Sequence, residues 1–497
     1  MSLKSFAAKI LAKRVKRKIL RWSGSPKETQ QAVLAKLLKA ASNTAFGKDH
    51  GFDSIKSQAE FANKVPIRDY EALRPYADRV VQGESNVLWP GKPLYFAKTS
   101  GTTSGAKYIP LTKESMPEHI KAARNAILCY IAETGKANFV DGKMIFLQGS
   151  PELNEKNGIQ LGRLSGIVAH YVPSYLQKNR MPSWETNCIE DWETKVDAIV
   201  QETIKEDMSV ISGIPSWVQM YFERLIEAGG KSVGELFPNF NLFIYGGVNY
   251  APYKAKFERL IGRSVPSIEL YPASEGFFAF QDSQSEKGML LLLDAGIFYE
   301  FVRADEFFEE NPNRIPVWEV ELGVNYVMLI SSNAGLWAYN LGDTVQFTSL
   351  KPYRVIVSGR IKHFISAFGE HVIGKEVEQA MKLAIDTFQL EINEFTVAPQ
   401  INPAEGLPYH EWLVETTGLP VDLQPIIDCI DNELQKQNSY YRDLIEGSIL
   451  RKLVITPLSP GSFNAHMKNQ GKLGGQNKIP RLSNDRKIAD ALLSLQG

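Results

Sequence analysis

The chain has 497 residues, 44% of them hydrophobic and 23% charged, which is ordinary for a globular enzyme of two or more domains. Its 56 Lys and Arg residues balance its 56 Asp and Glu residues, so no global basic field exists to hold nucleic acid. Cys129, Cys188 and Cys429 lie far apart without metal-ligand spacing. This pattern excludes a disulfide framework and favours buried thiols in a reducing compartment, the cytoplasm.

The N-terminal stretch "MSLKSFAAKILAKRVKRKILRW" is basic and amphipathic, and no apolar run in the chain is long enough to span a membrane. The stretch lacks the compact apolar core and the cleavage site of a secretory signal. A helix of this kind can lie on a membrane surface. We instead expect no stable membrane association and a helix that packs one apolar side on the protein body, formed by Phe6, Ile10, Leu11 and Ile19.

Residues 1 to about 90 are predicted to be mostly helical, with helical spacing of apolar residues in "ETQQAVLAKLLKAA". From about 94 to 350, short apolar runs such as "KMIFLQG", "MSVISG" and "NLFIYGG" alternate with helical stretches, which predicts α/β architecture. The later runs, around 289–303, 317–330 and 343–357, have few helix signals between them and favour a more antiparallel sheet.

The C-terminal part is predicted as a compact α+β unit. The stretch Tyr353–Ile365 predicts strand, turn, strand, and a helix follows in "GKEVEQAMKLAI". Two strands ("NEFTVAP" and "YHEWLVET"), a long helix over about 421–440 and a strand in "RKLVITPL" complete it. We therefore expect a large N-terminal domain, 1–357, and a small C-terminal domain, 358–497.

The segment "YFAKTSGTTSGAKYIPLT" is the most informative one. After an apolar run that ends at Ala97, glycines and hydroxyl side chains crowd together up to Lys107. Glycines bring backbone N–H groups close to an anion, hydroxyls add donors, and a lysine adds a mobile charge. No Gly-Lys-Ser/Thr closes the loop, so it is not a Walker A motif. Composition alone leaves two interpretations, a triphosphate cradle and a polar surface turn.

Two shorter motifs follow, each weak when taken alone. In "LYPASEGFFAFQ", Ser274 and Glu275 at a strand end can hold Mg²⁺, and Tyr271 can stack on a purine. In "WAYNLGDTVQF", Asp343 after Gly342 can accept hydrogen bonds from ribose hydroxyls. The alternative for both is an ordinary turn with a solvated carboxylate.

The order of these motifs resembles the adenylate-forming superfamily of acyl-CoA synthetases, adenylation domains and luciferases. Within it, the chain more closely resembles the Gretchen Hagen family of auxin-responsive acyl acid-amido synthetases. The compact "TSGTTSGAKYIPLT", the Tyr-Pro-Ala-Ser-Glu-Gly segment followed by aromatics, and the tail "GGQNKIPRL" carry that match. The resemblance implies a large adenylate-forming α/β domain whose β-sheets are packed by helices, and a mobile C-terminal domain that hinges near Ser358–Arg360.

The resemblance also implies roles for matching residues in the large domain. Tyr271 would border the adenine, Ser274 would contact the α-phosphate, Glu275 would hold Mg²⁺ and Asp343 would bind the ribose. The ATP phosphates would be held by Ser100, Gly101, Thr102, Thr103, Ser104 and Lys107. The acyl pocket would include Gly246, Gly247 and Val248, and Arg124 is a candidate partner for a substrate carboxylate or an ordinary surface arginine.

In the small domain, Arg360 occupies the Gly-Arg that opens the domain, and Lys478 matches a C-terminal lysine that serves adenylation in relatives. Plant members carry an ATP-contacting lysine where this chain has His371, within "SAFGEHV". An imidazole is only partly charged at neutral pH, so the substitution leaves that nucleotide contact in doubt. Glu370 and His371 look more like the Gly-Glu turn of the wider superfamily.

The implied activity is an ATP-dependent and Mg²⁺-dependent ligase that turns a small carboxylic acid into an acyl-adenylate and transfers the acyl group to an amino acid. Two alternatives stay open: an acyl-CoA ligase with a thiol acceptor, and a nucleotide-binding regulator without turnover. The "GGQNKIPRL" tail favours the first activity. A monomer is the default expectation, and the sequence names neither the acid nor the amino acid.

Overall fold

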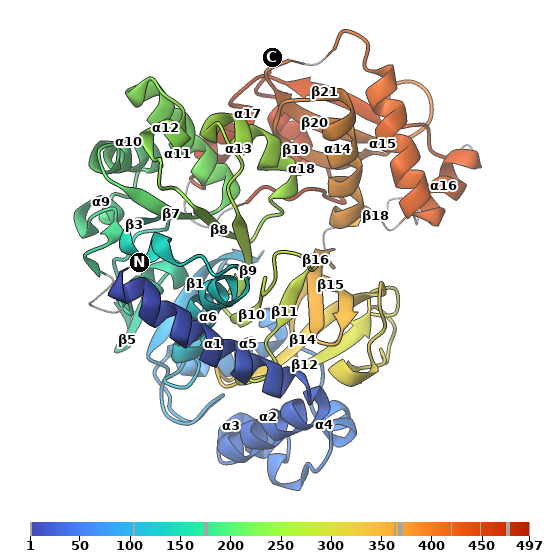
Figure 1. Ribbon diagram of the computed structural model, residues 1–497. Coiled ribbons are helices and arrows are strands. Elements are labelled where there is room, and N and C mark those ends of the chain that lie inside the picture. The colour runs from blue at the N-terminus through green and yellow to red at the C-terminus, as the bar shows by residue number, and fades with distance from the viewer. Residues whose placement is uncertain are drawn as a thin grey trace. The chain divides into compact units, whose positions relative to one another are not determined.

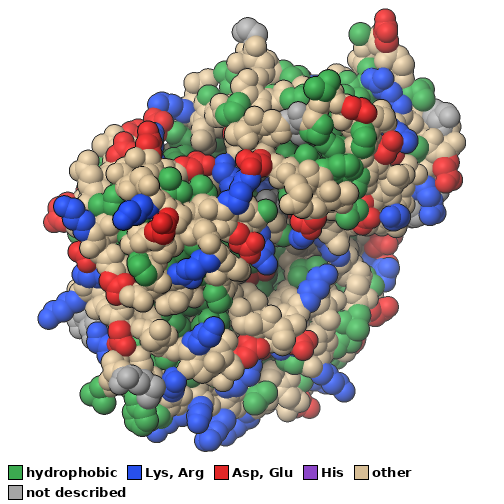
Figure 2. Space-filling view, turned by 45° about the horizontal axis from the view of Figure 1, so that its top comes forward, with side chains coloured by type: hydrophobic (Ala, Val, Ile, Leu, Met, Phe, Trp, Pro, Cys, Tyr) green, Lys and Arg blue, Asp and Glu red, His purple; other side chains and the backbone are tan. Residues whose placement is uncertain are grey.

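The computed structural model describes residues 2–102, 105–172, 177–361, 364–365, 370, 372–418, 420–447, 449–473 and 478–496. The chain forms two compact units, which we call unit 1 (1–248 and 260–356) and unit 2 (249–259 and 357–497). The elements of both are drawn in Figure 1. On the face drawn in Figure 2, basic and acidic side chains are interspersed, as expected for a chain without net charge.

The first 90 residues of unit 1 are mostly helical, as predicted. The helices are α1 (Leu3–Ser23), α2 (Pro26–Ala41), α3 (Ala45–Asp49), α4 (Gln58–Lys64) and α5 (Tyr70–Val81), with a 3-10 turn η1 (Phe52–Ser54). Each of α1, α3, α4 and α5 begins at a Ser, Thr or Asp whose side chain accepts a backbone N–H of the first turn. These caps explain where the chain enters each helix.

The predicted packing face of α1 is wrong. Phe6, Ile10 and Leu11 are exposed, and only Ile19 of the four predicted residues is buried. The helix instead packs a stripe that includes Ala12 on α6 (Met116–Thr134), and the two helices lie side by side in Figure 1. Small side chains such as Ala12 let two helices approach closely, which outweighed the larger apolar side chains on the opposite face.

A sheet of twelve strands forms the centre of unit 1. One half is parallel, as expected for alternating strands and helices, and runs through β6 (Arg180–Met181), β3 (Lys143–Phe146), β7 (Met208–Ser212), β8 (Leu242–Gly246) and β9 (Ser267–Ala273). The helices between these strands are α7 (Leu164–Ala169), α9 (Trp184–Cys188), α10 (Trp192–Thr203), α11 (Pro215–Gly229), α12 (Val233–Leu236) and α13 (Lys254–Ile261). A short 3-10 turn, η2 (Asn138–Asp141), precedes β3. The 3-10 turn η3 (Ala251–Tyr253) and most of α13 follow β8 in the chain but belong to unit 2.

The other half of the sheet is largely antiparallel, which confirms the expectation for the later apolar runs. Its strands are β10 (Gly276–Phe280), β11 (Met289–Leu291), β16 (Tyr353–Arg360), β15 (Tyr339–Leu350), β14 (Asn325–Ser332), β12 (Ile297–Arg303) and β13 (Ile315–Pro316), and η4 (Val317–Glu319) follows β13. The run predicted over 289–303 is two strands, because a turn with Gly296 at φ 72° separates them. A smaller sheet joins β2 (Gly105–Leu111), β1 (Tyr95–Thr102), β5 (Ile159–Gly162) and β4 (Asn154–Lys156).

One buried ion pair connects distant segments of unit 1. Arg354 donates two hydrogen bonds to Asp282, at 2.8 and 3.1 Å, and Lys16 of α1 donates a third at 3.2 Å. The Asp282 side chain is 2% exposed, so its charge is compensated by the two cations rather than by water. This cluster fixes α1 to the sheet.

Unit 2 is the predicted α+β fold. Its sheet joins β19 (Ile392–Gln400), β20 (Tyr409–Thr416) and β21 (Val454–Leu458), and a two-stranded ribbon joins β17 (Phe364–Ile365) and β18 (Val372–Ile373). Its helices are α14 (Gly374–Phe388), α15 (Gln424–Gln437), α16 (Ser439–Glu446), α17 (Ser462–Asn469) and α18 (Lys487–Leu493). The single helix predicted over 421–440 is broken at Asn438, whose side chain accepts the N–H of Tyr441 and so starts a new helix.

The fold class predicted from the sequence, a large α/β domain followed by a small α+β domain, is therefore confirmed. The segment 249–259 was not foreseen as part of the smaller unit. Of the cysteines predicted to be buried, Cys129 is buried and the other two are half-buried. Among the described residues, no helix is long and apolar enough to cross a bilayer.

Candidate active site

Ser274 and Glu275 form the two-residue turn of the β9–β10 hairpin. Ala273 pairs with Gly276 across the turn, so the sheet holds both residues on a short connection. Ser274 is buried, and Glu275 is half-buried. A hydroxyl and a carboxylate are thus presented together at the end of a central strand.

Asp343 reaches the same region of unit 1 from a bulge in β15. Between the pairs Val327–Thr344 and Leu329–Asn340, one residue of β14 faces three residues of β15. Gly342 makes this possible, because it adopts φ 84° and donates its N–H to the Asn340 side chain at 2.8 Å. The bulge turns the Asp343 carboxylate toward β9.

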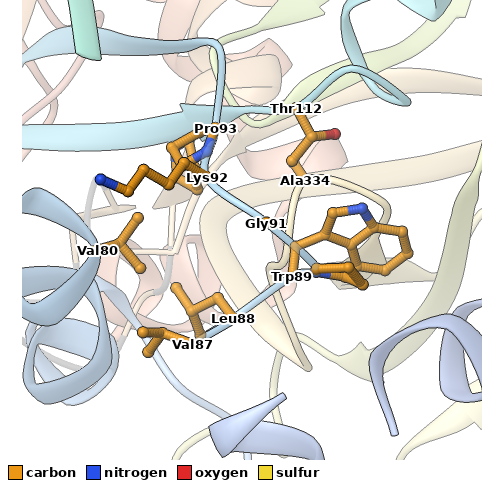
Figure 3. A pocket seen from close by; sticks show the side chains of 11 residues that line it. Val80, Val87, Leu88, Trp89, Gly91, Lys92, Pro93, Thr112 and Ala334 are labelled. Atoms are coloured by element: carbon orange, nitrogen blue, oxygen red, sulfur yellow. The ribbon is translucent and has the colours of Figure 1, made fainter. Parts of the chain in front are cut away.

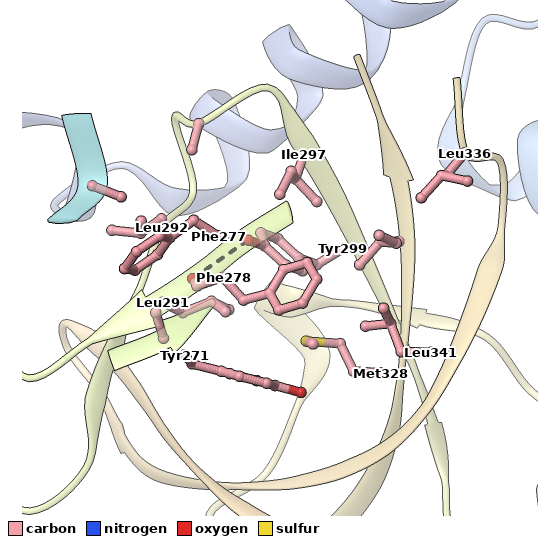
Figure 4. Close-up of a cluster of buried hydrophobic side chains, with 14 of the residues drawn as sticks. Tyr271, Phe277, Phe278, Leu291, Leu292, Ile297, Tyr299, Met328, Leu336 and Leu341 are labelled. Carbon is pink, nitrogen blue, oxygen red and sulfur yellow. Dashed lines mark hydrogen bonds between the residues drawn. The ribbon is translucent and has the colours of Figure 1, made fainter. Parts of the chain in front are cut away.

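Tyr271 connects the two motifs. Its hydroxyl donates a 2.7 Å hydrogen bond to Asp343, and its ring lies edge-on to Phe278 with centroids 5.1 Å apart. Figure 4 shows the Tyr271 ring at the margin of an apolar cluster that includes Leu291 and Met328. The structure therefore brings together the residues predicted for adenine and ribose, and it adds a direct bond that the sequence analysis missed.

Gly246, Gly247 and Val248 lie at the end of β8, next to the strand that carries Tyr271. Gly246 pairs with Leu270, and a Cβ on Gly246 would be 2.6 Å from the Leu270 carbonyl oxygen. Only glycine allows the two strands to approach this closely. These residues therefore lie next to β9, and their role in lining an acyl pocket stays a prediction.

The predicted phosphate loop is a β-hairpin. β1 and β2 pair antiparallel, from Tyr95 opposite Leu111 to Thr99 opposite Lys107. The register then shifts, and Thr102 pairs with Gly105. Lys107 lies across from Thr99, with its Nζ 5.8 Å from the centre of the Tyr70 ring. Thr103 and Ser104 lie outside the described residues, as do the side chains of Ser100 and Thr102. Only the backbone course of Gly101 is described.

Arg124 lies on the outer face of helix α6, which is typical of a surface arginine, and its predicted role in an acyl pocket stays a prediction. Arg124 is exposed and donates to the side chain of its neighbour Asn125 at 3.4 Å, as a surface arginine does. His119 on the same helix is buried instead, and burial lowers its pKa to about 4. His119 was not singled out in the sequence, where it stands five residues before Arg124.

Arg360, His371 and Lys478 belong to unit 2. Arg360 ends β16 and is exposed, and Lys478 is exposed as well. His371 lies outside the described residues, but its neighbour Glu370 is fully buried and bonds to the His410 imidazole at 2.9 Å. This buried pair fixes Glu370 within unit 2.

The segment that begins at Lys478 is held along β19. Thr396 donates its hydroxyl to the carbonyl of Pro480 at 2.7 Å, and the Val397 N–H donates to the carbonyl of Arg481 at 2.9 Å. Ser483 returns a backbone hydrogen bond to Val397 at 2.9 Å. The residues after Lys478 are therefore part of the sheet edge of unit 2, although they belong to no regular strand.

Arg481 anchors this segment in a mostly buried charge cluster, in which the Arg481 side chain is 10% exposed. Its guanidinium donates to Glu394, to Glu378 at 3.3 Å and to the hydroxyl of Tyr253 at 3.0 Å. Tyr253 in turn donates to Glu394 at 2.9 Å, and Asn249 donates to Glu378 at 2.7 Å. The cluster thus joins three parts of unit 2: the inserted segment 249–259, α14 with β19, and the tail that carries Lys478.

The cluster keeps the guanidinium charged. Burial alone would lower the pKa of Arg481, but Glu394, Tyr253 and Glu378 raise it well above its usual range. Burial raises the pKa of the Glu378 carboxyl, against the opposing effect of Arg481. Arg481 belongs to the tail motif "GGQNKIPRL", and the sequence predicted no role for it.

The donor set at the β9–β10 turn suits Mg²⁺ bound together with a nucleotide. Glu275 supplies a carboxylate and Ser274 a hydroxyl, both hard oxygen donors. Among the described residues, no group of three or more His, Cys, Asp or Glu side chains could hold a metal by itself. Mg²⁺ typically uses one or two carboxylates, with substrate phosphates and waters completing its shell. The residues therefore fit a metal that arrives with ATP.

A small cavity in unit 1 lies away from these motifs (Figure 3). Its walls are mostly apolar and include Val80, Leu88, Trp89, Pro93 and Ala334, together with Lys92. None of the predicted nucleotide or acyl residues lines it. We therefore do not assign either substrate to this cavity.

The arrangement of the sheets defines the class of protein. The structure aligns with the AtGH3.15 acyl acid amido synthetase in complex with 2,4-DB at a TM-score of 0.79 and 16% identity, covering 97% of this chain and 96% of that one. It also aligns with 2-hydroxyisobutyryl-CoA ligase in the postadenylation state at a TM-score of 0.61 and 13% identity, covering 94% and 91%. The fold is therefore that of adenylate-forming enzymes.

The sequence comparisons name the family. The GH3 family N-terminal domain matches residues 15–187, the central domain matches 290–360 and the C-terminal domain matches 375–487. The chain is 22% identical to the jasmonoyl-L-amino acid synthetase JAR4 of Nicotiana attenuata, over 81% of each chain. It is 21% identical to the indole-3-acetic acid-amido synthetase GH3.15 of Arabidopsis thaliana, over 92% of this chain and 90% of that one. The chain belongs to the GH3 family, which confirms the resemblance seen in its motifs.

Proposed function

We propose that this protein is an acyl acid-amido synthetase that activates a small carboxylic acid with ATP and joins it to an amino acid. The observation that carries the proposal is the contact between Tyr271 and Asp343 beside the Ser274–Glu275 turn. In a GH3 chain these are the residues that match the family's nucleotide motifs. Relatives are named for the transfer of acids such as indole-3-acetic acid to amino acids.

In the first half-reaction, a carboxylate oxygen of the acid attacks the α-phosphorus of ATP, and pyrophosphate leaves. Tyr271 borders the adenine, and Asp343 accepts hydrogen bonds from the ribose, so the α-phosphate is fixed relative to the acid. Ser274 donates to an α-phosphate oxygen, and Glu275 holds Mg²⁺. When bound, Mg²⁺ neutralises charge on the phosphate oxygens.

The hairpin from Ser100 to Lys107 holds the phosphates that leave. Its glycines and hydroxyls supply donors, and Lys107 supplies a cation. Lys478 contributes a second cation during adenylation and offsets the charge that grows at phosphorus. Arg481 is a positioning residue, because its buried ion pairs fix the segment that begins at Lys478.

In the second half-reaction, the neutral amino group of an amino acid attacks the acyl carbon. The C–N bond forms, the bond from the acyl carbon to AMP breaks, and the amine gives up a proton. AMP is a good leaving group, so this step needs mainly orientation and exclusion of water. The products are an amide, AMP and, from the first step, pyrophosphate.

The product of the reaction tests the proposal. The enzyme would be incubated with ATP, Mg²⁺, a panel of small aromatic and aliphatic acids, and either mixed amino acids or CoA, and the products would be identified by mass spectrometry. We expect an amide that contains one acid and one amino acid. A thioester without any amide would instead identify an acyl-CoA ligase.

Two variants of the C-terminal tail give a matched control. Lys478→Met removes the cation assigned to adenylation, and Lys472→Met removes an exposed lysine from the same tail. We expect product formation to fall about a hundredfold in the first variant and to stay near wild type in the second. Equal rates in both would remove Lys478 from the mechanism.

A further inference from the structure

The outer face of α1 exposes large apolar side chains that the core does not use. Leu3 is 84% exposed, Phe6 51% and Ile10 42%. These residues follow one another at spacings of three and four, so they form one stripe along the helix. Ala12, Ile19 and Trp22 face the protein on the opposite side. The stripe is therefore a surface and not a poorly packed part of the core.

The same helix carries an extreme local charge. Residues 3–23 contain eight Lys and Arg residues and no Asp or Glu, whereas the whole chain is neutral. Arg14, Arg17 and Arg21 lie on the same exposed face as Ile10. Arg14 and Arg17 follow Ile10 at spacings of four and seven residues, which are about one and two helical turns. None of them forms an ion pair with a described residue, whereas Lys16 and Lys18 contact Asp282 and Asp294. The outward face is cationic beside its apolar stripe.

The helix is held firmly on unit 1 by its inner face. Ser5 donates its hydroxyl to the carbonyl of Ala137 at 3.1 Å and to Asp141 at 3.0 Å, and Lys16 bonds to Asp282 at 3.2 Å. The exposed residues are therefore presented by a preformed helix, so little ordering would be needed when they bind. A fixed amphipathic helix is a suitable contact for a flat surface.

The two properties together select the partner. A second copy of the same face would place cations against cations, which disfavours a dimer through α1. Nucleic acid would contact the cations but would gain little from Leu3, Phe6 and Ile10. An anionic lipid surface suits both the apolar stripe and the cationic face of α1, because lipid head groups attract the cations and acyl chains accept the apolar side chains.

We propose that α1 docks this enzyme on an anionic membrane surface, with Leu3, Phe6 and Ile10 inserted at the head-group boundary. The arginines on the same face contact lipid phosphates. This proposal departs from the expectation of no stable membrane association, which went with Phe6 and Ile10 packed on the body, where both are in fact exposed. It does not depend on the proposed catalytic activity.

Flotation of the full chain with vesicles tests the proposal. One vesicle contains phosphatidylcholine alone, and the other contains about one third phosphatidylserine. We expect the protein to float with the anionic vesicles and to remain below with the neutral ones, and high salt should weaken the binding because it screens the cations. Flotation with neither vesicle, or equally with both, would overturn the proposal.

Paired variants separate the apolar and the charged contributions. Phe6→Ser with Ile10→Ser, and Arg14→Gln with Arg17→Gln, should each weaken vesicle binding about tenfold or more. The matched controls are Phe308→Ser, which removes a 67% exposed side chain elsewhere, and Lys205→Gln with Lys231→Gln, which removes two exposed cations. The controls should bind as wild type, and circular dichroism should show every variant folded.

Two further results would also overturn the proposal. One is unchanged vesicle binding in both α1 variants. The other is binding to an RNA homopolymer without binding to anionic vesicles, which would identify the cations of α1 as a nucleic-acid surface.

Discussion

The two units hold their predicted site residues in different ways. In unit 1, Tyr271, Ser274 and Glu275 lie on one strand and its hairpin turn, and a bulge in the same sheet brings Asp343 to them. In unit 2, Lys478 lies on an irregular segment whose anchor is the buried guanidinium of Arg481. A sheet fixes a side chain through many main-chain bonds, whereas the tail has only a few hydrogen bonds to β19 and depends in addition on one charged group.

This difference predicts how each region responds to damage. The loss of one side chain from the sheet should change the chemistry and leave the backbone in place. The loss of the Arg481 side chain should loosen the backbone of the tail, because two mostly buried carboxylates lose their counter-ion. Four substitutions, in order of decreasing expected effect, test this difference between the units.

Arg481→Met should have the largest effect, a loss of about 3–5 kcal/mol in the stability of unit 2, because it leaves Glu378 and Glu394 buried without their cation. Hydrogen exchange of β19 and β20, followed by mass spectrometry, measures this loss. Arg259→Met is the matched control, since Arg259 pairs with Glu391 where both side chains are about half exposed. That change should cost less than about 1 kcal/mol. Equal protection in the two variants would contradict the anchoring role.

Glu275→Gln should lower carboxylate-dependent ATP–pyrophosphate exchange about 100-fold to 1,000-fold and raise the Mg²⁺ concentration required, because an amide binds Mg²⁺ more weakly than a carboxylate. Hydrogen exchange of β9 and β10 should not change, since the hairpin keeps its main-chain bonds. Glu321→Gln removes an exposed glutamate of unit 1 and serves as the control. Exchange near the wild-type rate would remove Glu275 from the metal site.

His119 should make unit 1 sensitive to acid. Its pKa is lowered from 6.5 to about 4 by burial, so below pH 6.5 the unfolded chain binds a proton that the folded chain does not. Stability should therefore fall as the pH drops through this window, by about 3 kcal/mol in total. His119→Gln should lose less stability than wild type between neutral pH and about pH 5, as measured by denaturant titration. Identical pH profiles would show that the imidazole is solvated.

Tyr271→Phe should have the smallest effect, because the ring stays in the apolar cluster and only the hydrogen bond to Asp343 is lost. A net loss of about 1 kcal/mol corresponds to a KM for ATP about fivefold higher, with kcat little changed. Steady-state kinetics with ATP as the varied substrate measures it. A large fall in kcat at unchanged KM would mean that the hydroxyl acts in the chemical step.

The sequence predicted much of the part of the site that lies on the sheet of unit 1, and less of the part that lies in unit 2. Apolar runs of strand length located β3, β7 and β8, and the Gly342–Asp343 turn was correctly placed in a strand region. The bond between Tyr271 and Asp343 could not be predicted, because it depends on a bulge that only the pairing of β14 with β15 creates. Local pattern does not encode such registers.

The errors of the sequence analysis have a common cause. The outward face of α1 was predicted to be inward, because periodicity identifies two faces of a helix and not which one meets a partner. The segment 249–259 was expected to belong to the large domain, since its sequence neighbours do. Its place in unit 2 depends on Tyr253 and Asn249 bonding to residues distant in sequence.

The central claim is that this chain adenylates a carboxylic acid. Isotope exchange between pyrophosphate and ATP, in the presence of Mg²⁺ and an acid panel but without any amino acid or CoA, tests it most directly. We expect labelled pyrophosphate to enter ATP only when a suitable acid is present, because the first half-reaction is reversible and needs no acceptor. ATP that stays unlabelled with every acid, in a protein shown to bind ATP, would contradict the account.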